Sequence, residues 1–120
     1  MTDKSLTILV VEDEPIIRMD LALGFADLGY NVLEAEDAAT ALRVIDGGDT
    51  VDVLVTDIDM PGDMNGVALA SQVRRRSDSC RILIMSGGTR PASHVMPEHS
   101  PFLAKPLAAE DVIAALGRMP

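Results

Sequence analysis

Residues 53–62 read VLVTDIDMPG, a short apolar run that ends in a carboxylate and passes into a Pro-Gly turn. A continuous apolar run is typical of a strand buried on both faces, and the Pro-Gly pair marks a loop. Asp57 therefore stands where a buried strand breaks into a loop. An acidic side chain seldom occupies such a position for packing alone, so Asp57 is the first candidate for a functional residue.

Apolar runs of the same kind recur along the chain and alternate with segments of helical periodicity. This alternation predicts an α/β fold, in which a parallel sheet is covered by helices on both faces. The architecture that fits is a flavodoxin-like, doubly wound sheet of five parallel strands in the order 2-1-3-4-5. The strands are expected at about residues 6–11, 31–35, 52–56, 81–86 and 102–104.

The helices are recognised by their end signals and by their apolar stripes. Pro15 favours a first helical turn, Gly29 favours a left-handed end, and Asp37 and Asn65 are candidate caps. The buried stripe of the first helix should contain Ile17, Leu21, Gly24 and Leu28. We expect helices at about 14–29, 37–48, 65–76 and 108–117.

The segment between Ser86 and Lys105 leaves little room for a helix. Its glycines and prolines allow only a turn or two around Ala92 to Met96, so the fourth helix of the fold should be short or irregular. The arginine triplet 74–76, at the end of the third helix, is interpreted as a solvated helix end that complements the helix dipole.

Composition limits the class of protein. A chain of 120 residues is the size of one domain, so residues 1–120 are taken as a single unit. The net charge of −9 disfavours direct contact with nucleic acid. No apolar run approaches the roughly 20 residues that span a bilayer, so we expect a soluble cytoplasmic protein. The single cysteine, Cys80, is interpreted as a small buried hydrophobic residue.

Charged and polar side chains follow four of the expected strands. Glu12 and Asp13 follow the first, Asp57 ends the third, Ser86 ends the fourth, and Lys105 follows the fifth. In the order 2-1-3-4-5 the first and third strands are neighbours, and ligands bind outside the carboxyl ends of strands at that point. These residues should therefore meet at one edge of the sheet.

Clustered carboxylates repel one another unless a cation is present. Oxygen ligands without histidine or cysteine point to Mg²⁺, with Mn²⁺ as a possible substitute. Such a site, balanced by Lys105, could accept an anionic phosphoryl group, and Asp57 is then the candidate nucleophile for an acyl phosphate. No Gly-rich phosphate-binding fingerprint follows the first strand, so a bound nucleotide is not expected as the donor.

Four motifs in order carry a family resemblance over nearly the whole chain, from about Leu6 to Leu116. The chain resembles the receiver (response-regulator) domain of two-component signalling. The motifs are VVEDEP at 10–15, TDIDMPG at 56–62 with Gly66, IMSG at 84–87 and FLAKP at 102–106.

The resemblance implies that Asp57 accepts a phosphoryl group from a phosphohistidine of a histidine kinase or a histidine phosphotransfer protein. Glu12 and Asp13 would serve Mg²⁺, with the backbone carbonyl of Asp59 as a further ligand. The phosphorylated domain would act on a downstream protein or effector domain that the sequence does not identify, and no other cofactor is implied.

The resemblance also assigns roles to residues at the ends of the last strands. Ser86 matches the switch hydroxyl, and Lys105 matches the lysine that pairs with the phosphoryl group. The peptide bond before Pro106 is often cis in the family. Phe102 matches the aromatic switch position but could equally be a fixed core residue.

Two other functions remain open at this point. Asp57-Ile58-Asp59 also reads as the Asp-x-Asp nucleophile of a phosphatase or dehalogenase-like enzyme, although that motif usually opens its domain and needs a longer chain. A degenerate receiver that only binds other proteins is the second alternative. The preferred interpretation is a regulatory phosphoacceptor and not an enzyme.

Overall fold

The computed structural model describes residues 6–60, 62, 64–87 and 101–118. Its strands form one parallel sheet in the order β2-β1-β3-β4-β5, as the sequence predicts. In chain order the described elements are β1 (Thr7–Val11), α1 (Pro15–Asp27), β2 (Asn31–Ala35), α2 (Ala38–Asp46), β3 (Val53–Asp57), α3 (Gly66–Arg76), β4 (Arg81–Ser86), β5 (Phe102–Ala104) and α4 (Ala109–Gly117).

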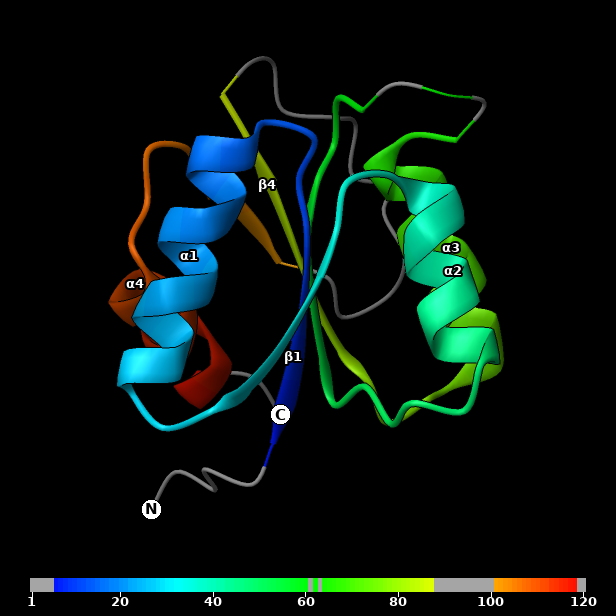
Figure 1. Cartoon of the computed structure of the whole chain (residues 1–120), viewed down its shortest axis with the longest axis horizontal. Helices are drawn as coiled ribbons and strands as arrows, with labels where there is room; N and C mark the ends of the chain where they lie inside the picture. The colour runs from blue at the N-terminus through cyan, green and yellow to red at the C-terminus, as the bar shows by residue number, and fades with distance from the viewer. Residues whose placement is uncertain (1–5, 61, 63, 88–100, 119–120) are drawn as a thin grey trace.

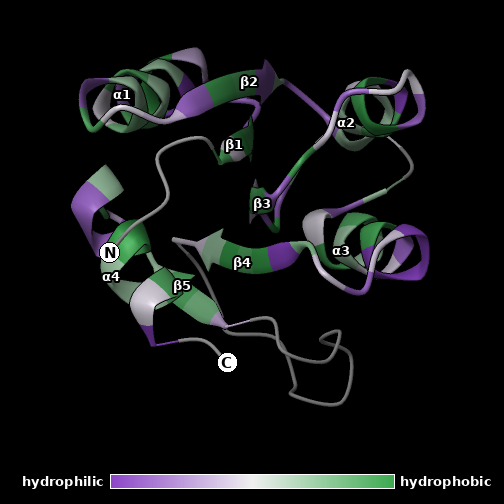
Figure 2. Cartoon of the chain, turned by 90° about the horizontal axis from the view of Figure 1, so that it is seen from below, coloured by the Kyte–Doolittle hydropathy of each residue, from purple (hydrophilic) through white to green (hydrophobic). Residues whose placement is uncertain are grey.

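The sheet is covered on both faces. Helices α1 and α4 pack on one face and α2 and α3 on the other (Figure 1), and the strands between them are largely apolar (Figure 2). Each face has its own buried cluster, one around Phe25 and Leu83 and the other around Leu54 and Leu69. A sheet buried on both faces explains why β1, β3 and β4 are largely apolar and do not alternate between apolar and polar residues.

The predicted strands agree with the structure to within one residue at each end, and the predicted caps are present. Asp37 accepts a hydrogen bond from the Thr40 amide, and Asn65 accepts one from the Ala68 amide. Gly29 has a φ of 95°, the left-handed conformation that favours glycine after a helix. The helical turn expected around 92–96 lies outside the described residues.

The predicted stripe of α1 is partly wrong. Leu21 is buried together with Ala22 and Phe25, but Ile17 is 37% exposed. Ile17 lines a groove with Pro106 and Leu107 and is not part of the buried cluster on this face. The helical period was correct, but it could not show that this position faces a groove and not the core.

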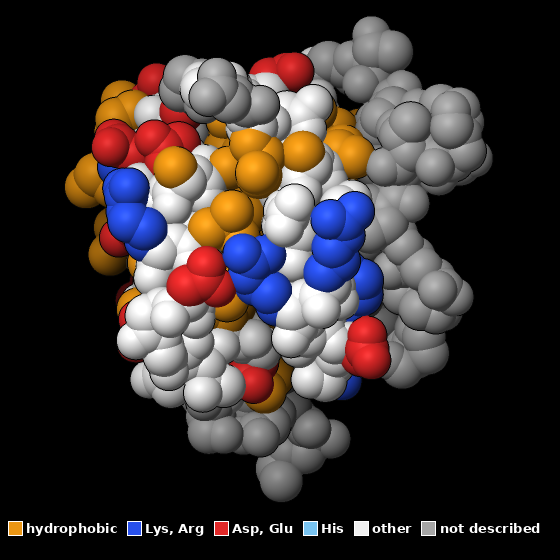
Figure 3. Space-filling model, turned by 90° about the vertical axis from the view of Figure 1, so that its right-hand side faces the viewer, with side chains coloured by type: hydrophobic (Ala, Val, Ile, Leu, Met, Phe, Trp, Pro, Cys, Tyr) orange, Lys and Arg blue, Asp and Glu red, His pale blue; other side chains and the backbone are white. Residues whose placement is uncertain are grey.

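The arginines that end α3 act within the fold. The Arg74 guanidinium donates to the carbonyls of Ser77, Asp78 and Cys80, and Arg76 forms an ion pair with Asp46 of α2 at 2.9 Å. Basic and acidic side chains lie next to one another on this face (Figure 3). Arg75 and Arg76 are exposed, as a solvated helix end predicts, whereas Arg74 is half-buried and holds the turn before β4.

Cys80 is packed as the sequence suggests. Its side chain is buried, and this burial raises the pKa of the thiol to about 11. Within the described part of the chain, no helix has the length and apolar character required to cross a membrane.

Candidate functional site

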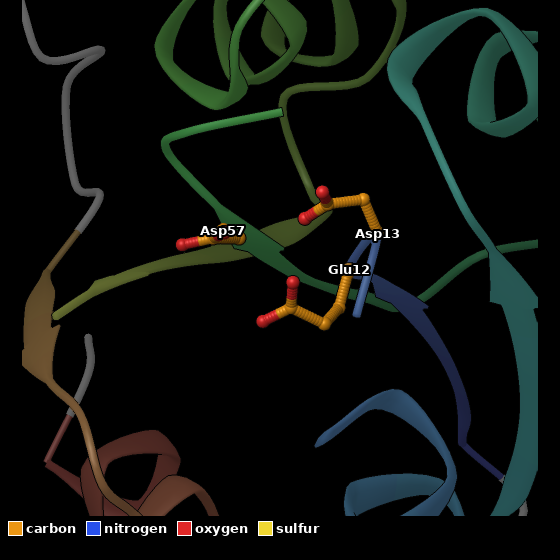
Figure 4. Close-up of side chains that lie close together, drawn as sticks. All are labelled: Glu12, Asp13 and Asp57. Atoms are coloured by element: carbon orange, nitrogen blue, oxygen red, sulfur yellow. The ribbon is translucent and has the colours of Figure 1, made fainter. Parts of the chain in front are cut away.

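Two adjacent strands bring the acidic residues together. β1 and β3 are paired so that Val11 lies beside Thr56, which places Glu12 and Asp13 next to Asp57 at the carboxyl edge of the sheet. One carboxylate oxygen from each of the three residues lies within 4.8 Å of the other two. Figure 4 shows the three side chains projecting from the ends of β1 and β3. The neighbourhood predicted from topology is present.

The three acids differ in exposure. The side chain of Asp13 is exposed, whereas Glu12 is 1% and Asp57 5% exposed. Glu12 and Asp57 are thus buried carboxylates in a largely apolar protein, and burial disfavours their charged forms. Their charges must be balanced by a nearby cation.

Lys105 supplies one such cation. Its backbone amide donates to the carbonyl of Ser86 at 2.9 Å, which fixes the residue beyond the end of β5. Its Nζ donates to Glu12 Oε1 at 2.5 Å and lies 3.2 Å from Asp57 Oδ1. One ammonium group therefore joins the end of β1 to the end of β3. The following Lys105–Pro106 peptide bond is cis.

The pKa values of these three groups follow from burial and pairing. Burial raises the pKa of Glu12 and of Asp57 above their ordinary values, although the Lys105 ammonium opposes the rise in both. Burial alone would lower the pKa of Lys105, but its hydrogen bond to Glu12 and the charge of Asp57 outweigh it and raise that pKa. The lysine therefore stays charged, while the carboxylates gain from any further cation.

The backbone around Asp57 is held by close contacts. The amide of Ile58 donates to the Met85 carbonyl at 3.1 Å, and the amide of Gly66 donates to the Ile58 carbonyl at 2.9 Å. A Cβ atom added at Gly66 would overlap the carbonyl oxygen of Asp57. Glycine is thus required where α3 begins, because the helix passes directly against the backbone of Asp57.

The start of α1 is capped by Glu14, and the Glu12 side chain binds the amide of this capping residue. Glu14 is the N-cap and accepts a hydrogen bond from the Ile16 amide, while Glu12 Oε2 accepts one from the Glu14 amide at 3.1 Å. Arg18 donates to the backbone carbonyl of Glu12 at 2.8 Å. Arg18 is a contact that the sequence analysis did not predict.

Comparisons with known proteins assign the family. The sequence model of one protein family, the response regulator receiver domain, matches residues 8–117. The chain belongs to this family. A response regulator receiver protein from Sinorhizobium medicae is 26% identical and superposes with a TM-score of 0.85 over 96% of this chain and 94% of that one. The response regulator TrrA from Thermotoga maritima, solved in complex with Mg²⁺–BeF, is 25% identical with a TM-score of 0.78 over 94% and 97% of the two chains.

Two curated relatives are longer proteins. Regulator of RpoS from Escherichia coli is 40% identical over 79 residues, which are 66% of this chain and 23% of that protein. Sensor kinase CckA from Brucella abortus is 30% identical over 119 residues, which are 96% of this chain and 12% of that protein. The receiver domain therefore spans less than a quarter of either relative.

Family membership decides between the function classes. A receiver domain is a regulatory phosphoacceptor of two-component signalling and not a catalytic enzyme, so the phosphatase or dehalogenase alternative is rejected. The acidic pocket of Glu12, Asp13 and Asp57 is typical of a phosphoaccepting switch. Membership also implies a histidine kinase as partner.

The other predicted residues lie on β4 and β5 or in the loops that follow β3 and β5. Ser86 is 2% exposed at the end of β4, and Lys105 follows β5 on the adjacent strand. Phe102 begins β5, is half-buried, and packs against the cluster on the α2–α3 side of the receiver domain. Asp59 is exposed, two residues beyond Asp57. The switch roles of Ser86 and Phe102 and the ligand role of the Asp59 carbonyl remain predictions.

The donor set fits a hard divalent cation. The candidate ligands are carboxylate oxygens, and the described metal-ligating cluster contains neither histidine nor cysteine. Such oxygen ligands suit Mg²⁺ or Mn²⁺, and magnesium retains several waters when one or two carboxylates hold it. The acidic cluster of the receiver domain is therefore compatible with a Mg²⁺ site.

Proposed function

We propose that this receiver domain, comprising residues 1–120, is a phosphorylation-controlled switch in which Asp57 is the phosphoacceptor. The phosphoryl donor is a phosphohistidine of a histidine kinase or of a histidine phosphotransfer protein. The observation that carries the proposal is the single ammonium group of Lys105, which lies between the buried carboxylates of Glu12 and Asp57 beside exposed Asp13.

In the proposed reaction an oxygen of Asp57 forms a bond to phosphorus while the bond from phosphorus to the histidine nitrogen breaks. The histidine leaves with the bonding electron pair and takes up a proton, and Asp57 becomes an acyl phosphate. A carboxylate nucleophile needs little further chemical help, so the protein contributes positioning and charge neutralisation.

The surrounding residues have separate roles in this proposal. Lys105 is already within 3.2 Å of Asp57 and would pair with a phosphoryl oxygen, and the Ser86 hydroxyl would donate to another. Mg²⁺, or Mn²⁺ in its place, would be held by Glu12, Asp13, Asp57 and the Asp59 carbonyl, and would neutralise the transferring phosphoryl group.

The consequence of phosphorylation would be a change of state read by another protein. Movement of Ser86 toward the phosphoryl group would repack the end of β4 and the neighbouring Phe102, and this would bias two preexisting conformations. The downstream partner is a protein or an effector domain. The charge of −9 argues against direct nucleic-acid binding, and we place the switch in the cytoplasm.

The test is the intact mass after incubation with Mg²⁺ and acetyl phosphate. We expect one phosphoryl adduct in the wild-type protein, none in Asp57→Asn, and an unchanged adduct in Asp78→Asn. Asp78 is a suitable control because it is an exposed aspartate that precedes β4, at the opposite edge of the sheet. A wild-type protein that acquires no adduct would be a degenerate receiver that acts only through protein binding.

A further inference from the structure

Arg18 connects the acidic turn, residues 12–14 between β1 and α1, to β2 at the edge of the sheet. It lies in the first turn of α1, and its side chain is 18% exposed. Nη1 donates to the backbone carbonyl of Glu12 at 2.8 Å, and Nε donates to Glu34 Oε1 at 3.2 Å. Glu34 belongs to β2, so one guanidinium group joins three consecutive elements of the fold.

Both backbone polar groups of Glu12 are thereby tied to the end of β2. The Glu12 amide donates to the carbonyl of Ala35 at 3.1 Å, and the Glu12 carbonyl is held through Arg18 by Glu34. The Glu12 carbonyl belongs to the peptide bond that leads into Asp13. Because a peptide group is planar, holding this oxygen fixes the plane from which the Asp13 backbone continues into the pocket.

We propose that Arg18 is a positioning residue for the metal site: with Glu34 it holds the Glu12–Asp13 peptide in the orientation that brings the Asp13 carboxylate beside Asp57. This inference rests on the proposed function, in which Asp13 serves Mg²⁺. Arg18 itself touches neither metal nor phosphoryl group. It acts through the backbone, in the way that residues behind metal ligands orient them.

The chemistry of arginine suits this task. Its planar guanidinium presents several N–H donors in fixed directions, so Nη1 and Nε can serve two acceptors at once. A lysine could reach one of these acceptors with its single ammonium but would not hold both in a fixed relative position. The Glu34 carboxylate also offsets the positive charge that Arg18 places close to a cation site.

Charge and positioning predict opposite results when Arg18 is removed. If Arg18 mattered only as a charge, Arg18→Ala would remove a repulsive cation and Mg²⁺ would bind more tightly. If Arg18 holds the acidic turn, the same substitution loosens the ligands and Mg²⁺ binds more weakly. The sign of the change therefore separates the two explanations.

The experiment compares wild-type protein with Arg18→Ala, Arg18→Lys and the control Arg75→Ala. Arg75 is exposed at the C-terminal end of α3, so its loss changes the net charge by the same amount as the loss of Arg18 and does not touch the acidic turn. Amide hydrogen exchange at residues 12–14 is measured by NMR without metal, and the Kd for Mg²⁺ by calorimetric titration.

We expect Arg18→Ala to speed exchange at residues 12–14 and to raise the Kd for Mg²⁺ about tenfold, the lower end of the usual effect of such partners. Arg18→Lys should fall between Arg18→Ala and the wild type, and Arg75→Ala should match the wild type in exchange. Unchanged exchange together with equal or tighter Mg²⁺ binding in Arg18→Ala would overturn the inference. A wild-type protein that binds no Mg²⁺ refutes the proposed function instead, and the metal-free exchange rates still decide whether Arg18 holds the turn.

Discussion

Substituting Gly66 by alanine is the most direct test of how the backbone of Asp57 is held. The added Cβ would overlap the Asp57 carbonyl oxygen and lie 2.7 Å from its carbonyl carbon, whereas real Cβ contacts are essentially never shorter than 3.0 Å. The obstacle is backbone on both sides, so no flexible side chain can move away. Either α3 or the end of β3 must shift.

The cost can be worked out from these contacts. Overpacking in a close-packed region costs about 1–3 kcal/mol, and the shift would weaken the 2.9 Å hydrogen bond from the Gly66 amide to the Ile58 carbonyl, which contributes about 1 kcal/mol. We therefore expect Gly66→Ala to lower the free energy of unfolding by about 2–4 kcal/mol. For a chain of this length the midpoint of thermal unfolding should fall by roughly 10 °C.

Gly117→Ala provides the matched control. Gly117 is the last residue of α4, and a Cβ there meets no described atom within 4 Å. Because alanine is the better helix former, this variant should be unchanged or more stable by up to about 1 kcal/mol. Both variants are compared by urea and thermal unfolding, and by the rate of adduct formation with acetyl phosphate. A Gly66→Ala protein within about 0.5 kcal/mol of wild type and equally fast in phosphorylation would refute the argument, since that difference is no larger than a typical surface substitution.

Three further predictions concern the charges of the pocket. Lys105→Met leaves Glu12 buried without its partner and should lower the free energy of unfolding by about 2–4 kcal/mol at pH 7. The loss is smaller than for a fully buried pair because Lys105 is partly exposed. Urea unfolding that matches the wild type would contradict this prediction. At low pH, Asp57→Asn should be as stable as the metal-free wild type, and it should become the more stable protein as pH rises. The raised pKa of Asp57 stabilises the folded wild type below the ordinary pKa of 3.8, and this stabilisation is lost as pH passes the raised value. Thermal unfolding between about pH 4 and 7.5 measures the difference in midpoint between the two proteins, and a difference that does not change with pH would contradict the prediction. Saturating Mg²⁺ should raise the midpoint of thermal unfolding of the wild type but not that of Asp13→Ala. Removal of the metal with a chelator should return the wild-type midpoint to its metal-free value.

The fold was predictable because its signals are local. The runs at β1, β3 and β4 are largely apolar, Asn65 and Asp37 stand at helix starts, and strand order then determines which strand ends meet. The pairing of Val11 with Thr56 is enough to bring the acids together without knowledge of any side chain. The strand order thus places residues that are far apart in the sequence next to one another in one site.

Contacts that depend on side-chain reach were not predictable in the same way. The hydrogen bond from Lys105 to Glu12 depends on how far each side chain extends across the gap, and the link from Arg18 to Glu34 depends on the direction in which α1 leaves the acidic turn. Ile17 follows the same rule, because its 37% exposure depends on which residues pack beside the first turn of α1 and not on the helical period. Local patterns identify the elements, whereas the distances between elements decide these contacts.

The charges of the pocket suggest an order of events for the proposed switch. Glu12, Asp13 and Asp57 carry three formal negative charges and Lys105 one positive charge, which leaves a net of −2 when no metal is bound. An incoming phosphoryl group is itself anionic and would meet this excess at close range, where burial weakens solvent screening. A divalent cation brings the sum to zero, so we expect phosphorylation of Asp57 to require metal first. Burial adds to this requirement: it raises the pKa of Glu12 and of Asp57 because a charged carboxylate removed from water is destabilised unless a cation lies close to it.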